Sequence, residues 1–203
     1  MSACSTRRLF LFAVFTVLLV SCADRSPVSP TNDQGAQAQS RQLQSSSNPV
    51  DRPIKGDCTP TFTFIDPPQA GACAVFQQVP SAFIAIGGRC EVSHLGRTAV
   101  NAVQQLVFQL DTSGQPVLVD GQPVVIQLRN CSTLTAANGD ELVHTTIGDV
   151  TPAGPAQVAF SGSMTFVGGT GRFSTASGSA TFSGTASLAT NTGAFSFEGT
   201  VVY

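Results

Sequence analysis

Residues 160–166 read FSGSMTF, a segment in which apolar residues and glycine alternate with hydroxyl side chains. The same period of two continues through 182–188, FSGTASL, and through 195–203, FSFEGTVVY. Because successive side chains of a β-strand point to opposite faces, this pattern is typical of a sheet with one buried side and one solvated side. The three segments therefore predict antiparallel β-strands.

Short strands separated by turn signals account for the rest of residues 58–203. We expect strands near 59–65, 73–79, 82–87, 89–100, 103–110, 124–136 and 141–147. Gly87-Gly88 and Asn138-Gly139 are among the turn signals between them, and the near-duplicates GQPV at 114–117 and 121–124 predict an inserted hairpin. Eight or more such strands indicate an all-β barrel or sandwich, and closure into a barrel would remove exposed edges.

A family resemblance appears at Val167-Gly168-Gly169-Thr170-Gly171-Arg172-Phe173, followed by Ala176-Ser177-Gly178. This segment is similar to the GGTG-x-F…A-x-G signature of the allene oxide cyclase and dirigent barrels. Together with residues 94–97 and 135–142, it also resembles uncharacterised bacterial exported proteins that share this barrel. The resemblance covers residues from about 85 to 203, and it implies an antiparallel eight-stranded (allene oxide cyclase-like) barrel with a central cavity.

The three glycines of this signature, Gly168, Gly169 and Gly171, are interpreted as a structural turn. Glycine adopts positive φ without a steric penalty, and Phe173 then returns the chain to a buried face. A phosphate-binding loop would require glycine at residue 174, which is serine, and a helix after it. We therefore predict no nucleotide site and no cofactor.

The N-terminus predicts export and lipidation. Arg7 and Arg8 precede an apolar run that is too short to span a bilayer, and Leu19-Val20-Ser21-Cys22 resembles a bacterial lipobox. The sequence thus predicts a lipoprotein signal peptide at 1–21, a lipidated disordered tether at 22–57 and a β-barrel domain at 58–203. The predicted location is the bacterial cell envelope, lipid-anchored, at the outer membrane if the host has one. A plainly secreted protein and a signal anchor are the alternatives.

Four cysteines remain in the predicted domain: Cys58, Cys73, Cys90 and Cys131. An even number in an exported protein favours two disulfides, with three possible connectivities. We slightly favour Cys58 with Cys73 and Cys90 with Cys131, and buried free thiols are the alternative. The spacings are too wide for a metal site, so none is predicted.

Composition excludes one class of partner and identifies no activity. Lys55 is the only lysine, and loss of Arg7 and Arg8 with the signal lowers the net charge from −2 to −4, so nucleic acid is not an expected partner. No catalytic residue can be assigned from a motif. Glu141 and His144 would point to opposite faces of one strand and form no acid/base pair.

His94 is the possible cavity residue, because it shares a strand face with Cys90 and Val92. A hydrogen-bonded core histidine is the simpler interpretation of it, and a ligand contact or general base is the other.

Two functional hypotheses follow. The first is a membrane-anchored envelope lipoprotein that binds a small apolar ligand or an envelope partner. The second is an allene oxide cyclase-like isomerase, in which a preformed apolar cavity folds a flexible substrate toward ring closure. An open lumen with convergent polar side chains would keep both hypotheses, and a lumen filled by phenylalanine would exclude both.

Overall fold

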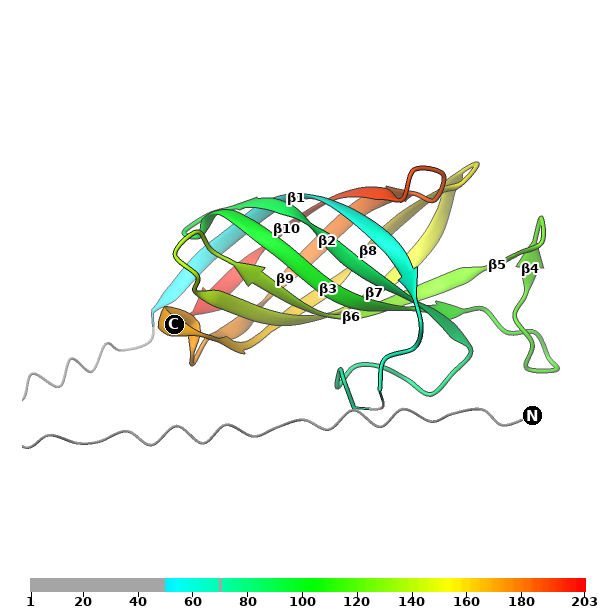
Figure 1. Cartoon of the computed structure of the whole chain (residues 1–203), viewed down its shortest axis with the longest axis horizontal. Coiled ribbons are helices and arrows are strands. Elements are labelled where there is room, and N and C mark those ends of the chain that lie inside the picture. The colour runs from blue at the N-terminus through cyan, green and yellow to red at the C-terminus, as the bar shows by residue number, and fades with distance from the viewer. Residues whose placement is uncertain (1–49, 70) are drawn as a thin grey trace, which may run out of the picture. The chain divides into compact units, whose positions relative to one another are not determined.

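In the computed structural model, which describes residues 50–69 and 71–203, eight strands form one closed antiparallel barrel (Figure 1). The barrel strands are β1 (Asp51–Ile65), β2 (Ser81–Val92), β3 (Gly96–Phe108), β6 (Val125–Thr135), β7 (Glu141–Gly154), β8 (Gln157–Gly169), β9 (Ser177–Ser187) and β10 (Thr192–Val202). They follow the order β1-β10-β9-β8-β7-β6-β3-β2, and β1 pairs with both β10 and β2. The expected eight-stranded barrel is confirmed, and closure leaves none of these strands at an edge.

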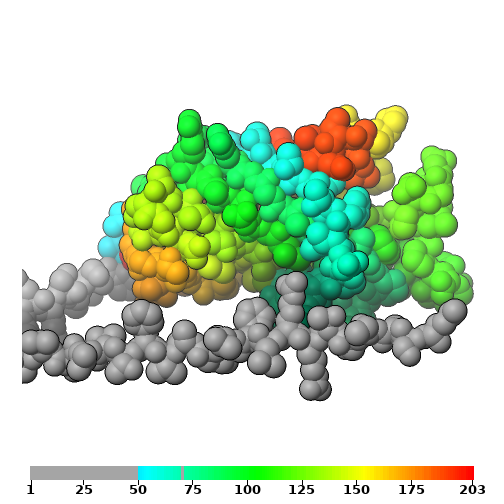
Figure 2. Space-filling model, in the orientation of Figure 1, coloured from blue at the N-terminus to red at the C-terminus, as the bar shows by residue number. Residues whose placement is uncertain are grey.

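A hairpin extends from one end of the barrel, between β3 and β6. It consists of β4 (Leu118–Val119) and β5 (Gln122–Pro123), joined through Asp120 and Gly121, which both have positive φ. Figure 2 shows it projecting beyond the body of the barrel. The insertion predicted from the repeated GQPV is therefore confirmed.

The barrel begins at Asp51, so the predicted domain boundary at residue 58 is wrong. Ile54 is completely buried and Gly56 also faces the interior, which makes the first half of β1 part of the fold. The charged residues Lys55 and Asp57 alternate with these inward positions, and they gave the segment the composition of a tether. The predicted signal peptide, Cys22 and the tether up to residue 49 lie outside the described residues. Within the part of the chain that the structure describes, no helix could cross a membrane.

The predicted turn at Gly87-Gly88 and the predicted strand at 73–79 were also wrong. In both places, contacts with segments distant in sequence determine the local structure. Gly87-Gly88 is not a turn, because β2 runs straight through it. A side chain at residue 88 would meet the backbone of Thr59 and Pro60 on β1. Residues 73–79 form no strand, because they lie in the β1–β2 connection over the outer face of β3 and β6.

This connection is fixed by side chains instead of a β-ladder. The fully buried Gln105 of β3 accepts a hydrogen bond from the Gln77 amide (2.9 Å) and donates one to the Gln77 carbonyl (2.7 Å). Arg129 of β6 donates to the Val75 carbonyl (3.1 Å). The side chains of Gln105 and Arg129 therefore take the place of a neighbouring strand.

Two disulfides are present, as predicted, but their pairing differs from the expected one. Cys58 bonds to Cys90, directly opposite it inside the barrel, and Cys73 bonds to Cys131. Cys131 lies between the lumen-facing residues Asn130 and Ser132 of β6, so its own side chain points outward. An inward cysteine cannot reach an outward one across a wall, which excludes the pairing of Cys90 with Cys131.

Candidate functional site

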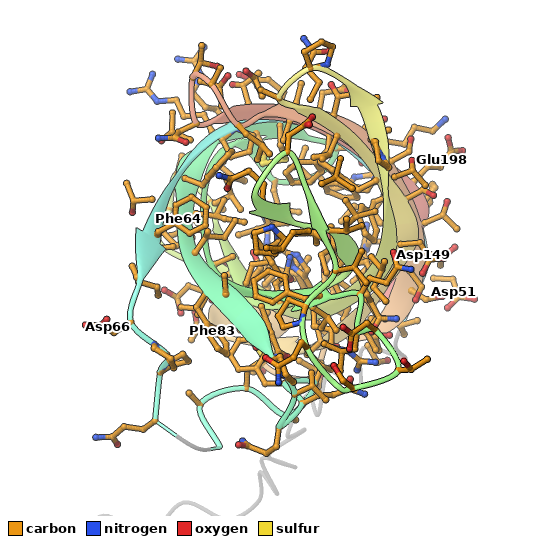
Figure 3. All side chains as sticks on the ribbon, turned by 90° about the vertical axis from the view of Figure 1, so that its right-hand side faces the viewer. Asp51, Phe64, Asp66, Phe83, Asp149 and Glu198 are labelled. Carbon is orange, nitrogen blue, oxygen red and sulfur yellow. A yellow bond between two sulfur atoms is a disulfide. The ribbon has the colours of Figure 1, made fainter. Side chains whose placement is uncertain are left out.

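The lumen of the barrel contains a cavity of about 120 Å³. Figure 3 views the barrel end-on from the side of the β4–β5 hairpin, with Asp149 and Glu198 on the outside of the ring of strands. The residues that line the cavity are Pro60, Phe62, Ile84, Ile86, Val100, Ala102, Gln104, Leu106, Val125, Leu128, Asn130, Ser132, His144, Thr146, Val150, Val158, Phe160, Met164, Phe182, Ala186, Leu188, Gly193 and Phe195. They come from all eight barrel strands and the β9–β10 turn, and none carries a full charge at neutral pH.

The cavity reaches solvent at the hairpin end of the barrel. Leu188, in the β9–β10 turn, lines the cavity and is also 48% exposed. The opposite end is filled. There Phe173, Leu142 and Ile54 are completely buried and none of them lines the cavity. The cavity is therefore a pocket with one mouth.

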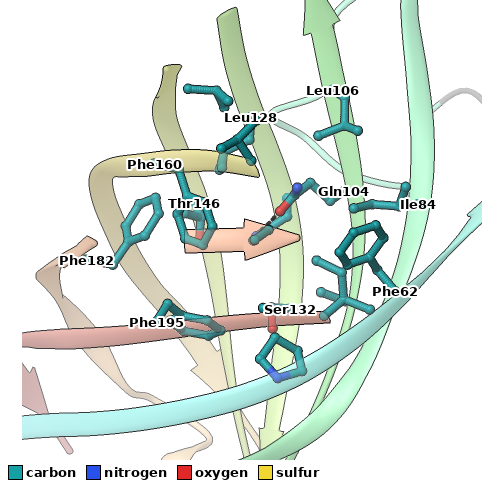
Figure 4. A pocket seen from close by; sticks show the side chains of 18 of the residues that line it. Phe62, Ile84, Gln104, Leu106, Leu128, Ser132, Thr146, Phe160, Phe182 and Phe195 are labelled. Atoms are coloured by element: carbon teal, nitrogen blue, oxygen red, sulfur yellow. Dashed lines mark hydrogen bonds between the residues drawn. The ribbon is translucent and has the colours of Figure 1, made fainter. Parts of the chain in front are cut away.

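Polar side chains gather on one wall of this pocket, which we call the polar wall: Gln104, Asn130, Ser132, His144 and Thr146. Pairing across β3, β6 and β7 aligns Gln104, Asn130 and Thr146 in one row. Ser132 and His144 form the next row, nearer the filled end of the barrel. Figure 4 shows Gln104, Ser132 and Thr146 facing the cavity. Side chains far apart in sequence thus converge on a single site.

The polar wall is incompletely hydrogen-bonded. Asn130 Nδ2 donates to Gln104 Oε1 (3.4 Å), and Ser132 Oγ donates to the Asn101 carbonyl (3.3 Å). Three buried atoms have no partner: Asn130 Oδ1, His144 Nδ1 and Thr146 Oγ1. A buried polar atom without a partner costs about 1–3 kcal/mol, so the wall can bind a polar group.

His144 is neutral at physiological pH. It is 3% exposed, and burial lowers its pKa to about 4. Its ring lies edge-on to Phe166, with centroids 6.1 Å apart. A neutral imidazole offers one donor and one acceptor nitrogen, so His144 can take part in hydrogen bonding or accept a proton.

The remaining walls are apolar and rich in phenylalanine. Phe160, Phe182 and Phe195 line the pocket from β8, β9 and β10, and Phe62 lines it from β1 (Figure 4), whereas the polar wall is on β3, β6 and β7. Phe160 and Phe182 pack with their ring centroids 6.1 Å apart. The pocket therefore has one polar and one hydrophobic side, a combination typical of sites for small molecules.

The predicted cavity residue His94 does not reach the cavity, and this prediction was wrong. It lies in the exposed β2–β3 turn with φ of 65°, and its Nε2 is 3.0 Å from the Pro53 carbonyl oxygen at the filled end. The strand alternation used to place it ends at Val92. His144 occupies the lumen instead. The alternation of Leu142, His144 and Val150 on one face could have identified it.

The signature glycines lie at the filled end, away from the cavity. Gly168 and Gly171 have φ of 124° and 55°, and Gly171 begins the 3₁₀ helix η1 (Gly171–Phe173). A side chain at residue 169 would meet the Glu141 carbonyl, and one at 171 would meet the Asp140 carboxylate. This conformation is the one expected of a structural turn, and it places the Phe173 ring in the barrel end.

Comparison with known proteins adds no identification: no family model, curated protein or solved structure matches this chain. Among the described residues, no group of three or more histidine, cysteine or acidic side chains could hold a metal ion.

Proposed function

We propose that the barrel binds a small, largely apolar molecule in its lumen. The observation that carries this proposal is the open pocket of about 120 Å³ in an otherwise close-packed barrel. Protein interiors rarely leave such voids. An apolar cavity of about 150 Å³ binds benzene, so a pocket of this size is suited to a ligand of about one aromatic ring.

A matched pair of variants tests the proposal. Ala102 lines the pocket and Ala99, on the same strand, is exposed on the outer face. We expect small aromatic probes to bind saturably in calorimetry and to raise the melting temperature. Ala102→Phe should abolish binding and Ala99→Phe should leave it unchanged. If no probe binds, or if both variants bind alike, the proposal is wrong.

The same proposal includes anchoring in the bacterial envelope through Cys22. The lipobox-like sequence before Cys22 supports it, and the chain between Cys22 and Asp51 would then link the lipid to the barrel. One acyl chain gives marginal membrane binding, whereas several bind firmly. Radiolabelled palmitate should enter the wild type expressed in a bacterial host and not Cys22→Ser. Equal labelling of the two proteins would contradict the anchor.

His144 favours a second candidate, an isomerase or cyclase of the allene oxide cyclase kind. Its neutral imidazole, whose Nδ1 has no partner, could polarise a bound substrate through a hydrogen bond, a role that does not require the ring to take up a proton. Incubation with unsaturated epoxides should then give a product of unchanged mass and altered retention, lost in His144→Phe. If the epoxides are recovered unchanged, the isomerase candidate is wrong and ligand binding remains the proposed function.

A further inference from the structure

The position of the polar wall along the barrel restricts the ligand further. On β6, Leu128 lies nearer the mouth than Asn130, and Leu134 lies in the filled end. On β7, Val150 and Leu142 flank the polar residues in the same way. The polar wall is therefore at the deep end of the pocket, below a collar of apolar side chains.

The unpartnered atoms of this wall are fully buried in this conformation, so a ligand reaches them only by displacing the side chains beside them, and their chemistry defines the group that the wall can receive. Asn130 Oδ1 is an acceptor and requires a donor from the ligand, whereas Thr146 Oγ1 can donate or accept. None of the lining residues supplies an ionic partner. A charged ligand group would lose its hydration without compensation, which is far more costly than burying a hydroxyl.

We propose that the lumen selects an apolar molecule carrying an uncharged hydrogen-bonding group, such as a hydroxyl, which enters first and binds Asn130, His144 and Thr146. This inference rests on the proposed ligand-binding function and specifies its ligand class. The apolar body of the molecule would then lie against Phe62 and Phe160, nearer the mouth. A carboxylate or ammonium group at the same position is disfavoured.

Phenol, toluene and benzoate test this selection at pH 7, because they share one ring and differ in a single substituent. Without a hydrogen-bond partner in the pocket, phenol would have to leave its hydroxyl unpaired and would bind more weakly than toluene. We expect wild-type protein to bind phenol at least ten times more tightly than benzoate. This comparison of the three ligands uses the wild-type protein alone.

A second experiment removes polar side-chain atoms of the wall and replaces them with apolar groups of similar shape. Asn130→Leu combined with Thr146→Val should weaken phenol relative to toluene by ten-fold or more. Thr165→Val, on the exposed outer face of β8, is the matched control and should leave the ratio unchanged. Circular dichroism would confirm that each variant is folded.

The possible results distinguish failure of this inference from failure of the proposed ligand-binding function. If none of the three probes binds the wild type, the proposed function fails and this inference fails with it. If toluene binds but the double variant leaves the phenol-to-toluene ratio unchanged, only the selection is wrong. Tightest binding of benzoate would also overturn the selection alone.

Discussion

The two ends of the barrel interior follow the same alternation of inward and outward residues, yet they are filled differently. At the filled end, Phe166, Phe173 and Leu134 are at most 2% exposed, and Phe173 packs edge-on against Tyr203. At the mouth, the phenylalanines line an open pocket. The difference shows that alternation determines which residues are inside, whereas the local choice of side chains determines how much space remains.

The largest expected effect comes from truncating an aromatic ring at the filled end. Phe173→Ala should lower the free energy of unfolding by about 3–5 kcal/mol, because it creates a cavity in close-packed surroundings. Phe160→Ala, which only enlarges the existing pocket, should cost less than half as much. Denaturant titration measures both. Equal losses would mean that the two ends are packed alike.

Removing the outer disulfide should have the next largest effect. Cys73→Ala with Cys131→Ala opens a crosslink of sequence separation 58, which typically costs about 2–4 kcal/mol. It should also free the β1–β2 connection, so that chymotrypsin cuts at Phe76. Cys58→Ala with Cys90→Ala is the control and should leave Phe76 protected in the folded protein. Resistance of the first variant to chymotrypsin would show that Gln105 and Arg129 suffice to hold the connection.

Acid should destabilise the protein through His144. Its folded-state pKa of about 4 lies below the ordinary value of 6.5, so between these pH values the unfolded chain binds more protons. The free energy of unfolding should therefore fall by about 3 kcal/mol as pH drops through this window. His144→Leu should flatten that part of the profile, and His94→Gln, in the exposed turn, should not. Parallel profiles for wild type and His144→Leu would exclude a buried neutral imidazole.

The smallest expected effect is at the signature turn. Gly171→Val should cost more than about 1 kcal/mol, because its φ is positive and the new side chain meets Asp140. Gly114→Val has a similar φ but open space around it, so its loss should be smaller. Thermal unfolding measures the difference. An unchanged melting temperature in Gly169→Val and Gly171→Val, with ligand binding abolished, would make the turn a binding loop.

Much of the fold could be predicted from local pattern, and little of the site could. The inward positions of β10, from Phe195 to Val201, follow from the period of two, and the structure confirms them. His94 was misplaced because alternation was extended past the end of a strand. Nothing in the sequence around His144 shows that Asn130 and Ser132 lie beside it, because those residues belong to a different strand.

The sequence by itself determined the all-β class and the faces buried by the segments at 160–166, 182–188 and 195–201, and it favoured two disulfides, because these features depend on neighbours along the chain and on cysteine number. Only the tertiary structure decided the cysteine pairing, the place of the pocket and the convergence of Gln104, Asn130 and Thr146. Those features depend on register and closure between strands distant in sequence. A shift of one residue in that register would turn the polar wall outward.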